Sequence, residues 1–409
     1  MKERDHHMAG AKETTVPRVR SVVIGSIGFL TLVDLFAVQA ILPQLAERYR
    51  ISPAEMGLAA NGAALGMAVA GPLAAATLRG LARRTAVWAS LASLALPTAL
   101  LALAPSLAAF AALRILQGVF MASAFTLTLA HFGERCARTD APRALAAYVT
   151  GSVMANLLGR LIASVVADSY GATSAFLTFS ALNAGGALLA FGALTPVAPS
   201  TTDLHGDGLF RGFALHLGNR TLLCAFALGF LILFGFVGLF SYVGFALVSP
   251  QLGLSMREAG FVFLCFLPSL VTTPMAGRIA ARLGSTTSAA GSLLLALFGA
   301  LSTLVGDIVA IVSGLAMFAA GTFFAQAVVT SFVGRATTVD RATASGLYLS
   351  AYYCGGLAGA GVIGWLYERA GWHGAVIGVA LALAAATLLA LNLKDRPTET
   401  ARLDVATTR

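Results

Sequence analysis

Twelve apolar runs, each long enough to cross a bilayer as a helix, constrain the fold of this chain more than any other feature. They lie at about 21–43, 56–78, 86–104, 107–131, 144–167, 174–195, 221–246, 259–279, 286–304, 308–332, 344–367 and 374–393. Charged residues make up only 11% of the 409 residues, whereas a soluble protein carries about 25%. Because helices satisfy their own backbone hydrogen bonds in lipid, the sequence predicts an all-α polytopic membrane protein.

Polar segments divide the twelve runs into two groups of six. The predicted units are an N-terminal tail (1–20), a six-helix bundle (21–195), a linker (196–220), a second six-helix bundle (221–393) and a C-terminal tail (394–409). Short motifs recur between the two bundles at offsets of 200 to 203: Gly28-Phe-Leu with Gly229-Phe-Leu, Ser52-x-x-Glu55 with Ser255-x-x-Glu258, Gly118 with Gly321, and Gly159 with Gly359. Two repeated halves around a shared pathway, related by pseudo-two-fold symmetry, are a known plan for transporters.

The basic residues predict the orientation of the chain in the bilayer. If the amino terminus is cytoplasmic, 21 of the 27 Lys and Arg residues fall in the tails, the linker or cytoplasmic loops, four in the opposite loops and two inside spans. Cytoplasmic loops are the ones enriched in Lys and Arg, so both termini are predicted to be cytoplasmic. This topology also explains the net charge of +9, and no nucleic-acid partner is expected.

Three ionised side chains lie deep in the predicted spans: Asp34, Arg114 and Arg160. A charge at that depth costs about 2.5–3.5 kcal/mol or more unless it is neutralised, paired or hydrated. The simplest arrangement places Asp34 and Arg114 across one cavity, whose hydration and drying load and release a proton at Asp34. The alternative for Arg114 is a structural ion pair. For Arg160 two interpretations stay open: it extends an anion-attracting cavity, or it binds backbone carbonyls at a helix crossing.

Polar side chains at mid-span depth are the candidates for lining a substrate cavity, although a lone amide more often joins two helices. They are Gln39, Asn61, Gln117, Asn156, Arg160, Gln326, Tyr348 and Tyr352. Gln117 shares a helix face with Arg114. Tyr348 and Tyr352 share a face too, and either stack on a flat or cationic solute or pack against neighbouring helices.

Signals of enzymatic chemistry are missing from the sequence. It has no glycine-rich loop followed by Lys-Ser/Thr, so ATP is not the expected energy source. Its six histidines form no HExxH pattern, and its four cysteines have no metal-ligand spacing. We therefore expect no enzyme activity, no cofactor and no metal site.

Several motifs resemble the major facilitator superfamily over nearly the whole chain. Asp34 with Gln39 and Pro43 is similar to the first-span motif of drug/proton antiporters, and Arg114-x-x-Gln117-Gly118 is similar to the fourth-span motif. The fifth-span antiporter motif is matched by Asn156-x-x-Gly159-Arg160, with Arg160 at the place of the usual proline. Tyr352-Tyr353-x-Gly355 and Gly371-Trp372 resemble the YnfM-type branch of bacterial inner-membrane transport proteins.

The gating-loop motif of the family is present only in part. Its matching residues are Gly71, Arg79, Arg83 and Arg84 in the first copy, and Gly277, Arg282 and Gly284 in the second. The acidic residue of the motif is absent from the first copy and replaced by Ala281 in the second. The charge relay usual at this gate is therefore not expected here.

The resemblance implies a function as well as a fold. It implies a monomeric secondary transporter of the bacterial inner membrane that exports a small amphipathic or drug-like compound in exchange for protons, by alternating access. The expected partners are a small-molecule substrate, protons and the lipid bilayer. Two alternatives stay open: a proton symporter for uptake of a metabolite, and a membrane sensor with a transporter fold and no flux.

Overall fold

The computed structural model describes residues 18–77, 82–135, 141–194, 214–337 and 341–393, and these ranges are almost entirely helical. Arg79, the C-terminal tail and most of the N-terminal tail and of the linker lie outside them. The boundaries predicted for these polar segments therefore stay predictions.

The first half of the chain begins with a broken helix. Its elements are α1 (Arg18–Leu32), η1 (Ala37–Ile41), α2 (Leu42–Tyr49), α3 (Pro53–Ala60), α4 (Gly62–Thr77), α5 (Arg83–Leu101), α6 (Leu107–Arg135) and α7 (Ala141–Ala193). The chain bends by 51° between Ser21–Leu32 and Ala37–Tyr49, so the first span is interrupted at residues 33–36. A second, smaller interruption at Asn61 separates α3 from α4.

The second half repeats this plan with small differences. Its elements are α9 (Arg220–Val248), α10 (Met256–Val262), η2 (Phe263–Phe266), α11 (Leu267–Leu283), α12 (Ser285–Ser302), η3 (Thr303–Val305), α13 (Ile308–Ala336) and α14 (Arg341–Ala390). Its first span, α9, is continuous over 29 residues, unlike the broken first span of the other half.

The structure has fewer separate helices than the twelve predicted spans, because two of its helices are very long. The described residues contain nine helices long and apolar enough to cross a membrane, and ten with the broken first span. α7 has 53 residues and α14 has 50, about twice what a bilayer requires. Each is kinked near its middle, at Gly171 (φ 81°) and Gly371 (φ 58°), a backbone region that glycine enters readily. Counted as two spans each, they complete the predicted twelve.

Corresponding contacts recur in the two halves. The Ser52/Glu55 and Ser255/Glu258 motifs both form complete capping boxes, at the starts of α3 and α10. Gly159 lies against the backbone carbonyl of Val33, and Gly359 lies against that of Phe234, so neither position has room for a Cβ atom. Such close backbone approaches are typical of membrane helices. The predicted sequence repeat is thus also a repeat of packing.

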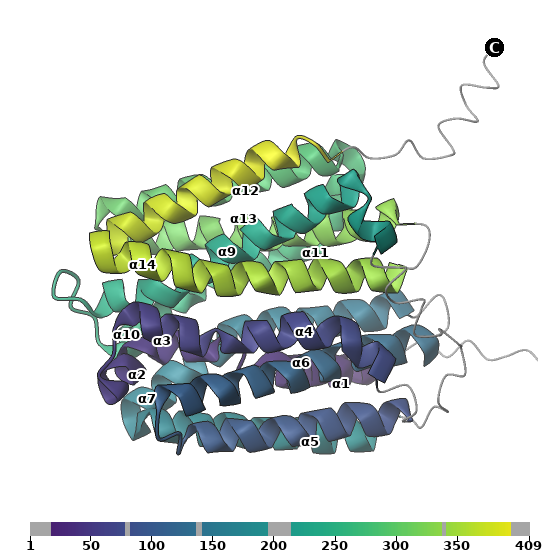
Figure 1. Cartoon of the computed structure of the whole chain (residues 1–409), viewed down its shortest axis with the longest axis horizontal. Coiled ribbons are helices and arrows are strands. Elements are labelled where there is room, and N and C mark those ends of the chain that lie inside the picture. Colours follow the sequence, from purple (N-terminus) through teal and green to yellow (C-terminus); the bar gives the residue numbers. More distant parts are fainter. Residues whose placement is uncertain (1–17, 78–81, 136–140, 195–213, 338–340, 394–409) are drawn as a thin grey trace, which may run out of the picture.

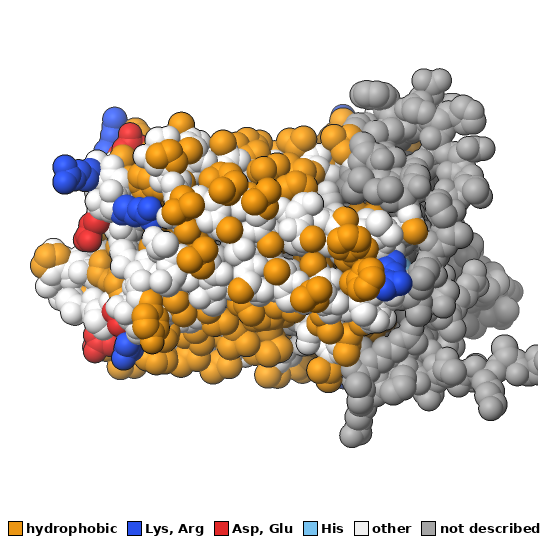
Figure 2. Space-filling model, turned by 90° about the horizontal axis from the view of Figure 1, so that it is seen from below, with side chains coloured by type: hydrophobic (Ala, Val, Ile, Leu, Met, Phe, Trp, Pro, Cys, Tyr) orange, Lys and Arg blue, Asp and Glu red, His pale blue; other side chains and the backbone are white. Residues whose placement is uncertain are grey.

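The helices lie side by side along the long axis of the molecule, with the first half below the second in Figure 1. We call the end that carries the loop at 249–255 and the kinks at Gly171 and Gly371 the α10 end. There the halves are joined by an ion pair between Arg257 and Asp168 (3.2 Å) and a hydrogen bond from Ser164 to the carbonyl of Met256. Charged side chains gather at this end, whereas apolar side chains cover much of the flank that Figure 2 shows. An apolar flank matches a bilayer environment.

Candidate functional site

Asp34 lies in the interruption of the first span and is 4% exposed. Its Oδ2 atom accepts hydrogen bonds from Thr98 Oγ1 (3.1 Å), Gln117 Nε2 (2.9 Å) and Asn183 Nδ2 (3.1 Å). These donors come from α5, α6 and α7, all in the first half. Its Oδ1 atom is buried and has no hydrogen-bond partner among the described residues. Asp34 therefore points into its own half of the protein.

Arg114 on α6 binds the backbone at both interruptions. Its Nε donates to the carbonyl of Ala60 (2.7 Å), Nη2 to that of Leu35 (2.8 Å) and Nη1 to that of Asp34 (3.3 Å). Carbonyls at the ends and breaks of helices lack intrahelical donors. The planar guanidinium supplies those donors to the first and second spans together, so it helps to position Asp34.

Gln117 stands between Arg114 and the Asp34 carboxylate. Arg114 Nη1 donates to Gln117 Oε1 (2.6 Å), while Gln117 Nε2 donates to Asp34. Because arginine has no acceptor, the amide oxygen must face Arg114 and the amide nitrogen must face Asp34. No side-chain ion pair within 4.0 Å joins Asp34 to Arg114 in the described residues. The structure thus brings the two charges into one site but connects them through an amide.

We call Asp34, Thr98, Arg114, Gln117 and Asn183 the Asp34 cluster. Sequence reasoning did not select Thr98 or Asn183. Asn183 is an amide in the run at 174–195, so the criterion that selected Gln117 also applies to it. Thr98 offered no comparable signal, because threonine in a span commonly bonds its own helix, as Thr98 also does with the carbonyl of Leu94 (2.8 Å).

Arg160, in the fifth span, forms a second site of a different kind. Its side chain is 0% exposed. Nη2 donates to Gln39 Oε1 (2.6 Å), and Nη1 donates to the backbone carbonyl (2.7 Å) and Oδ1 (3.2 Å) of Asn156. The backbone carbonyl belongs to the helix that carries Arg160, so the guanidinium is not held by carbonyls of a crossing helix.

Five phenylalanine rings surround the Arg160 guanidinium. The distances from its central carbon to the ring centroids are 5.3 Å for Phe36, 5.7 Å for Phe236, 5.4 Å for Phe240, 5.3 Å for Phe263 and 4.7 Å for Phe266. A guanidinium within about 6 Å of a ring centroid is attracted by the ring. We call these five rings and Arg160 the Arg160 cage; four of its rings belong to the second half.

Two amides and a serine connect the Arg160 cage across the two halves. Gln39 Nε2 donates to Ser241 Oγ (3.3 Å) and to Asn61 Oδ1 (3.3 Å), and Asn61 Nδ2 donates to Ser241 Oγ (3.0 Å). Gln39 lies on η1, immediately after the interruption that contains Asp34, and Ser241 lies on α9. The short η1 segment therefore lies between the Asp34 cluster and the second half.

The remaining cavity candidates lie in a tyrosine cluster within the second half. The rings of Tyr348 and Tyr352 stack with centroids 6.1 Å apart. Thr330 Oγ1 donates to the Tyr348 hydroxyl (3.4 Å), and Gln326 hydrogen-bonds Tyr352. Both tyrosines are buried, so in this conformation they pack within the protein.

The gating-loop residues form no charge relay within the described ranges. Arg84 donates to the carbonyl of Phe191 and lies 4.3 Å from its ring, while Arg83 begins α5. Gly71 and Gly277 face open space. Arg282 lies in the last turn of α11, and Gly284 (φ 84°) joins α11 to α12. Arg79 is outside the described residues.

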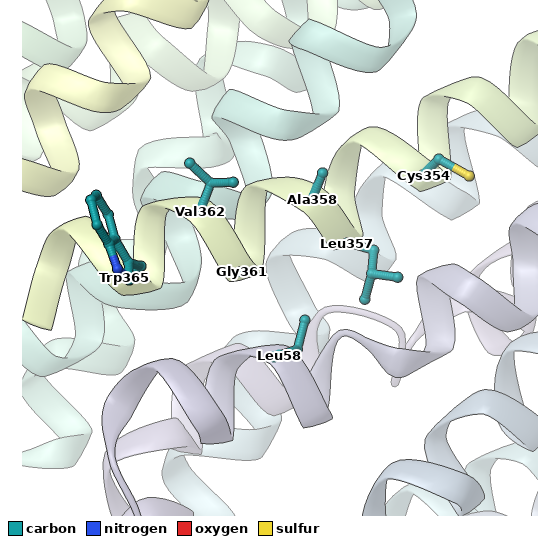
Figure 3. Close-up of a pocket in the computed structure, with 7 residues that line it drawn as sticks. All are labelled: Leu58, Cys354, Leu357, Ala358, Gly361, Val362 and Trp365. Atoms are coloured by element: carbon teal, nitrogen blue, oxygen red, sulfur yellow. The ribbon is translucent and has the colours of Figure 1, made fainter.

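A groove opens on the flank of the protein, along the seam between α3 and α14 (Figure 3). It is lined by Leu58, Cys354, Leu357, Ala358, Gly361, Val362 and Trp365. None of these side chains is charged or carries an amide, and none was a predicted site residue. Its polar groups are the indole N–H of Trp365 and the thiol of Cys354, and we assign the groove no part in the site.

Comparison with known proteins places this architecture in a family. The model of the Major Facilitator Superfamily matches residues 24–263 and 239–407. The inner membrane transport protein YnfM of Escherichia coli (strain K12) is 28% identical over 92% of this chain and 90% of its own length. The uncharacterized MFS-type transporter YybF of Bacillus subtilis (strain 168) is 24% identical over 89% and 91%.

Solved transporters share the fold at lower identity. The nucleoside transporter NupG matches with a TM-score of 0.74 and 14% identity, covering 92% of this chain and all of that chain. The human organic anion transporter MFSD10 matches with a TM-score of 0.70 and 20% identity, with the same coverage. With its twelve spans and the family model matched over nearly its whole length, this chain belongs to the major facilitator superfamily of transporters.

Proposed function

We propose that this transporter exports a small amphipathic compound in exchange for protons, and that Asp34 carries the proton. The observation that supports this most is the environment of Asp34, the one carboxylate that is buried among the described residues. It sits at a break in a spanning helix, where backbone and side chain can rearrange more easily than in a continuous helix. Ionisable residues inside a membrane protein are commonly parts of proton pathways.

Thr98 gives Asp34 a hydrogen-bonded arrangement in both protonation states. Its Oγ1 lies 3.1 Å from Asp34 Oδ2 and 2.8 Å from the carbonyl of Leu94. A hydroxyl has one proton, so it donates to only one of these oxygens at a time. With Asp34 ionised, Thr98 donates to the carboxylate. With Asp34 neutral, the Thr98 hydroxyl donates to the carbonyl of Leu94, and its oxygen accepts a hydrogen bond from the protonated carboxyl group.

A proton at Asp34 can influence the other half through the first span. Arg114 binds the carbonyls of Asp34 and Leu35, and Gln39 on the adjoining η1 segment contacts Ser241 of α9. A rearrangement at the break therefore changes the position of a residue that bridges the two halves. Two-half transporters alternate their access by movement of one half against the other.

Flux in proteoliposomes, screened with a dye and drug panel under an imposed pH gradient, tests this function. We expect wild-type flux that drives protons in the opposite direction, and loss of that flux in Asp34→Asn, which keeps the shape of the side chain but cannot titrate. Proton movement in the same direction as the substrate would indicate the alternative, a symporter for uptake. Binding without flux would indicate a sensor. Near wild-type flux in Asp34→Asn at equal expression would contradict the assignment of the proton site.

The hydroxyl of Thr98 has a matched control elsewhere in the protein. Thr322 is also buried and donates to carbonyls of its own helix, but it lies in the second half. Thr98→Val is expected to alter the pH profile of flux, whereas Thr322→Val is expected to leave the profile in place. An unchanged profile in Thr98→Val would remove the hydroxyl from the proton step.

The topology is part of the proposal: both termini and the linker face the cytoplasm, and the α10 end faces away from it. The 21-to-4 division of Lys and Arg between the two sets of loops supports it. Single cysteines at Gln251, near the α10 end, and at Leu217, in the predicted linker, provide the test. A membrane-impermeant thiol reagent added to intact cells should label Gln251→Cys and spare Leu217→Cys. The reverse labelling would invert the topology.

A further inference from the structure

We propose that the transported compound is an organic anion with an aromatic or apolar body, and that Arg160 holds its anionic group in the state in which the two halves separate at the α10 end, the side on which an exporter releases its compound. This inference rests on the proposed transport function and names the class of its substrate. Two observations support it: which groups contact Arg160, and which half of the protein each of these groups belongs to.

Arg160 is a buried cation with no acidic partner. No carboxylate of the described residues lies within 4.0 Å of its guanidinium, and its buried Nε has no hydrogen-bond partner. Arg114 differs, because all three of its guanidinium nitrogens donate to oxygen atoms. A charged group inside a membrane protein normally pairs with an opposite charge or faces a wet pathway. The capacity of Arg160 to bind an anion is therefore unused in this conformation.

The Arg160 cage is divided by the boundary between the halves. Phe36, Gln39 and Asn156 lie in the same half as Arg160, whereas Phe236, Phe240, Phe263 and Phe266 lie on α9 and η2 of the other half. Alternating access requires the halves to separate at each end in turn. Opening at the α10 end removes four of the five rings and leaves the guanidinium facing the pathway.

The exposed guanidinium then selects the chemistry of its ligand. Its planar N–H groups match the two oxygens of a carboxylate or sulfonate, and such charge-assisted pairs are the strong ones. The phenylalanine rings on the opposite wall offer an apolar surface for the rest of the molecule. An organic cation would meet like charge with no described carboxylate nearby. In the closed state the rings take the place of the anion, so the empty transporter can close without leaving the guanidinium unpartnered.

Three compounds of nearly equal shape test the inference: 2-naphthoate (anionic), 2-naphthamide (neutral) and 2-naphthylmethylammonium (cationic). Each compound is added as a competitor to wild-type protein in proteoliposomes. The measured quantity is how strongly it inhibits the flux of a compound that the dye and drug panel has identified as transported. We expect the wild type to prefer the carboxylate by about tenfold over the amide, since a hydrogen bond between charged groups is stronger than a neutral one. Arg160→Gln should lose this preference, and Arg160→Lys should keep part of it. The control Arg257→Gln removes an exposed positive charge at the same end and should leave the preference for the carboxylate unchanged.

Cys265 provides a readout that needs no flux. It lies on η2, the segment that carries the cage rings Phe263 and Phe266. In a protein with Cys136, Cys224 and Cys354 replaced by serine, 2-naphthoate should slow alkylation of Cys265 by the uncharged reagent N-ethylmaleimide. The amide should protect less, and Arg160→Gln should abolish protection by the carboxylate. Equal protection by all three compounds, or none by 2-naphthoate, would overturn the inference.

Different results would contradict the proton site at Asp34 and the anion site at Arg160. If Asp34→Asn retains proton-driven flux while 2-naphthoate still protects Cys265, the proton assignment is wrong and the anion site stands. If Asp34→Asn abolishes flux but the wild type prefers the amide or the ammonium compound, the transport function stands and the anion site is wrong.

Discussion

The Asp34 cluster and the Arg160 cage stabilise buried charges in opposite ways. Asp34 is held by polar groups from three helices of its own half, whereas Arg160 is surrounded by aromatic rings that come mainly from the other half. The Asp34 cluster can stay intact when the halves move apart. The Arg160 cage cannot, because separation removes four of its five rings.

Because the two sites are built differently, we expect them to respond to different signals. We propose that the Asp34 cluster responds to the proton concentration, and that the Arg160 cage responds to the separation of the halves and to an anionic ligand. Gln39 links them, because it lies five residues after Asp34 and accepts a hydrogen bond from Arg160.

Arg114→Leu should destabilise the protein more than Arg160→Leu. It leaves the carbonyls of Ala60 and Leu35 and the amide of Gln117 without their donor, an effect of about 3–5 kcal/mol for a broken buried charged network. Arg160→Leu replaces a cation by an apolar side chain among aromatic rings but leaves the buried Gln39 Oε1 without its donor, which is expected to cost about 1–3 kcal/mol. Unfolding in detergent micelles measures both, and Arg114→Lys should fall in between. Equal losses would show that the two arginines have equivalent structural roles.

Gln117→Met should disconnect Asp34 from Arg114 while keeping the volume of the side chain. The ionised carboxylate loses one donor, an effect of about 1.5–3 kcal/mol. The pH profile of flux should therefore move toward alkaline pH by about one to two units, at about 1.4 kcal/mol per unit. Combined with Asp34→Asn, the change should add no further loss, since both act on one proton step. A lower flux with an unmoved profile would make Gln117 a packing residue.

Phe266→Leu should favour opening at the α10 end. Phe266 is the cage ring nearest to the guanidinium, at 4.7 Å, and one cation–π contact is worth about 1 kcal/mol, or about fivefold in population. Disulfide formation between cysteines at Asp168 and Arg257, which are paired across the halves in the closed state, reports the opening. Phe110→Leu is the matched control, because Phe110 packs against Tyr49 and Phe176 within the first half. An equal change in both variants would argue against the cage.

The Arg257–Asp168 ion pair should contribute least. The two side chains are 52% and 29% exposed, and exposed pairs contribute about 0.2–1 kcal/mol. Arg257→Gln should therefore change unfolding only slightly, and raising the salt concentration should remove even that difference. A large, salt-insensitive effect would mean that this surface pair, and not the Arg160 cage, holds the α10 end closed.

The spans and the charged centres were predictable because hydrophobic length and a charge in lipid are visible along the chain. The repeat at offsets of 200 to 203 also predicted matching local structure, as the two capping boxes show. The partners of those charges were not predictable, since they depend on how each helix is rotated about its axis. The sequence contains many other threonines and phenylalanines in spans. Only the packing of the helices shows that Thr98 contacts Asp34 and that these four second-half rings contact Arg160.

We propose that Asp34 takes up and releases a proton within the first half of the protein. Infrared difference spectroscopy of the reconstituted protein between alkaline and acidic pH tests this without any substrate, because a protonated buried carboxyl group has its own carbonyl stretching band. We expect a band that titrates in the wild type and in Asp168→Asn, where a partly exposed carboxylate is lost, and that is absent in Asp34→Asn. A band that persists unchanged in Asp34→Asn would show that another group titrates and that Asp34 does not carry the proton.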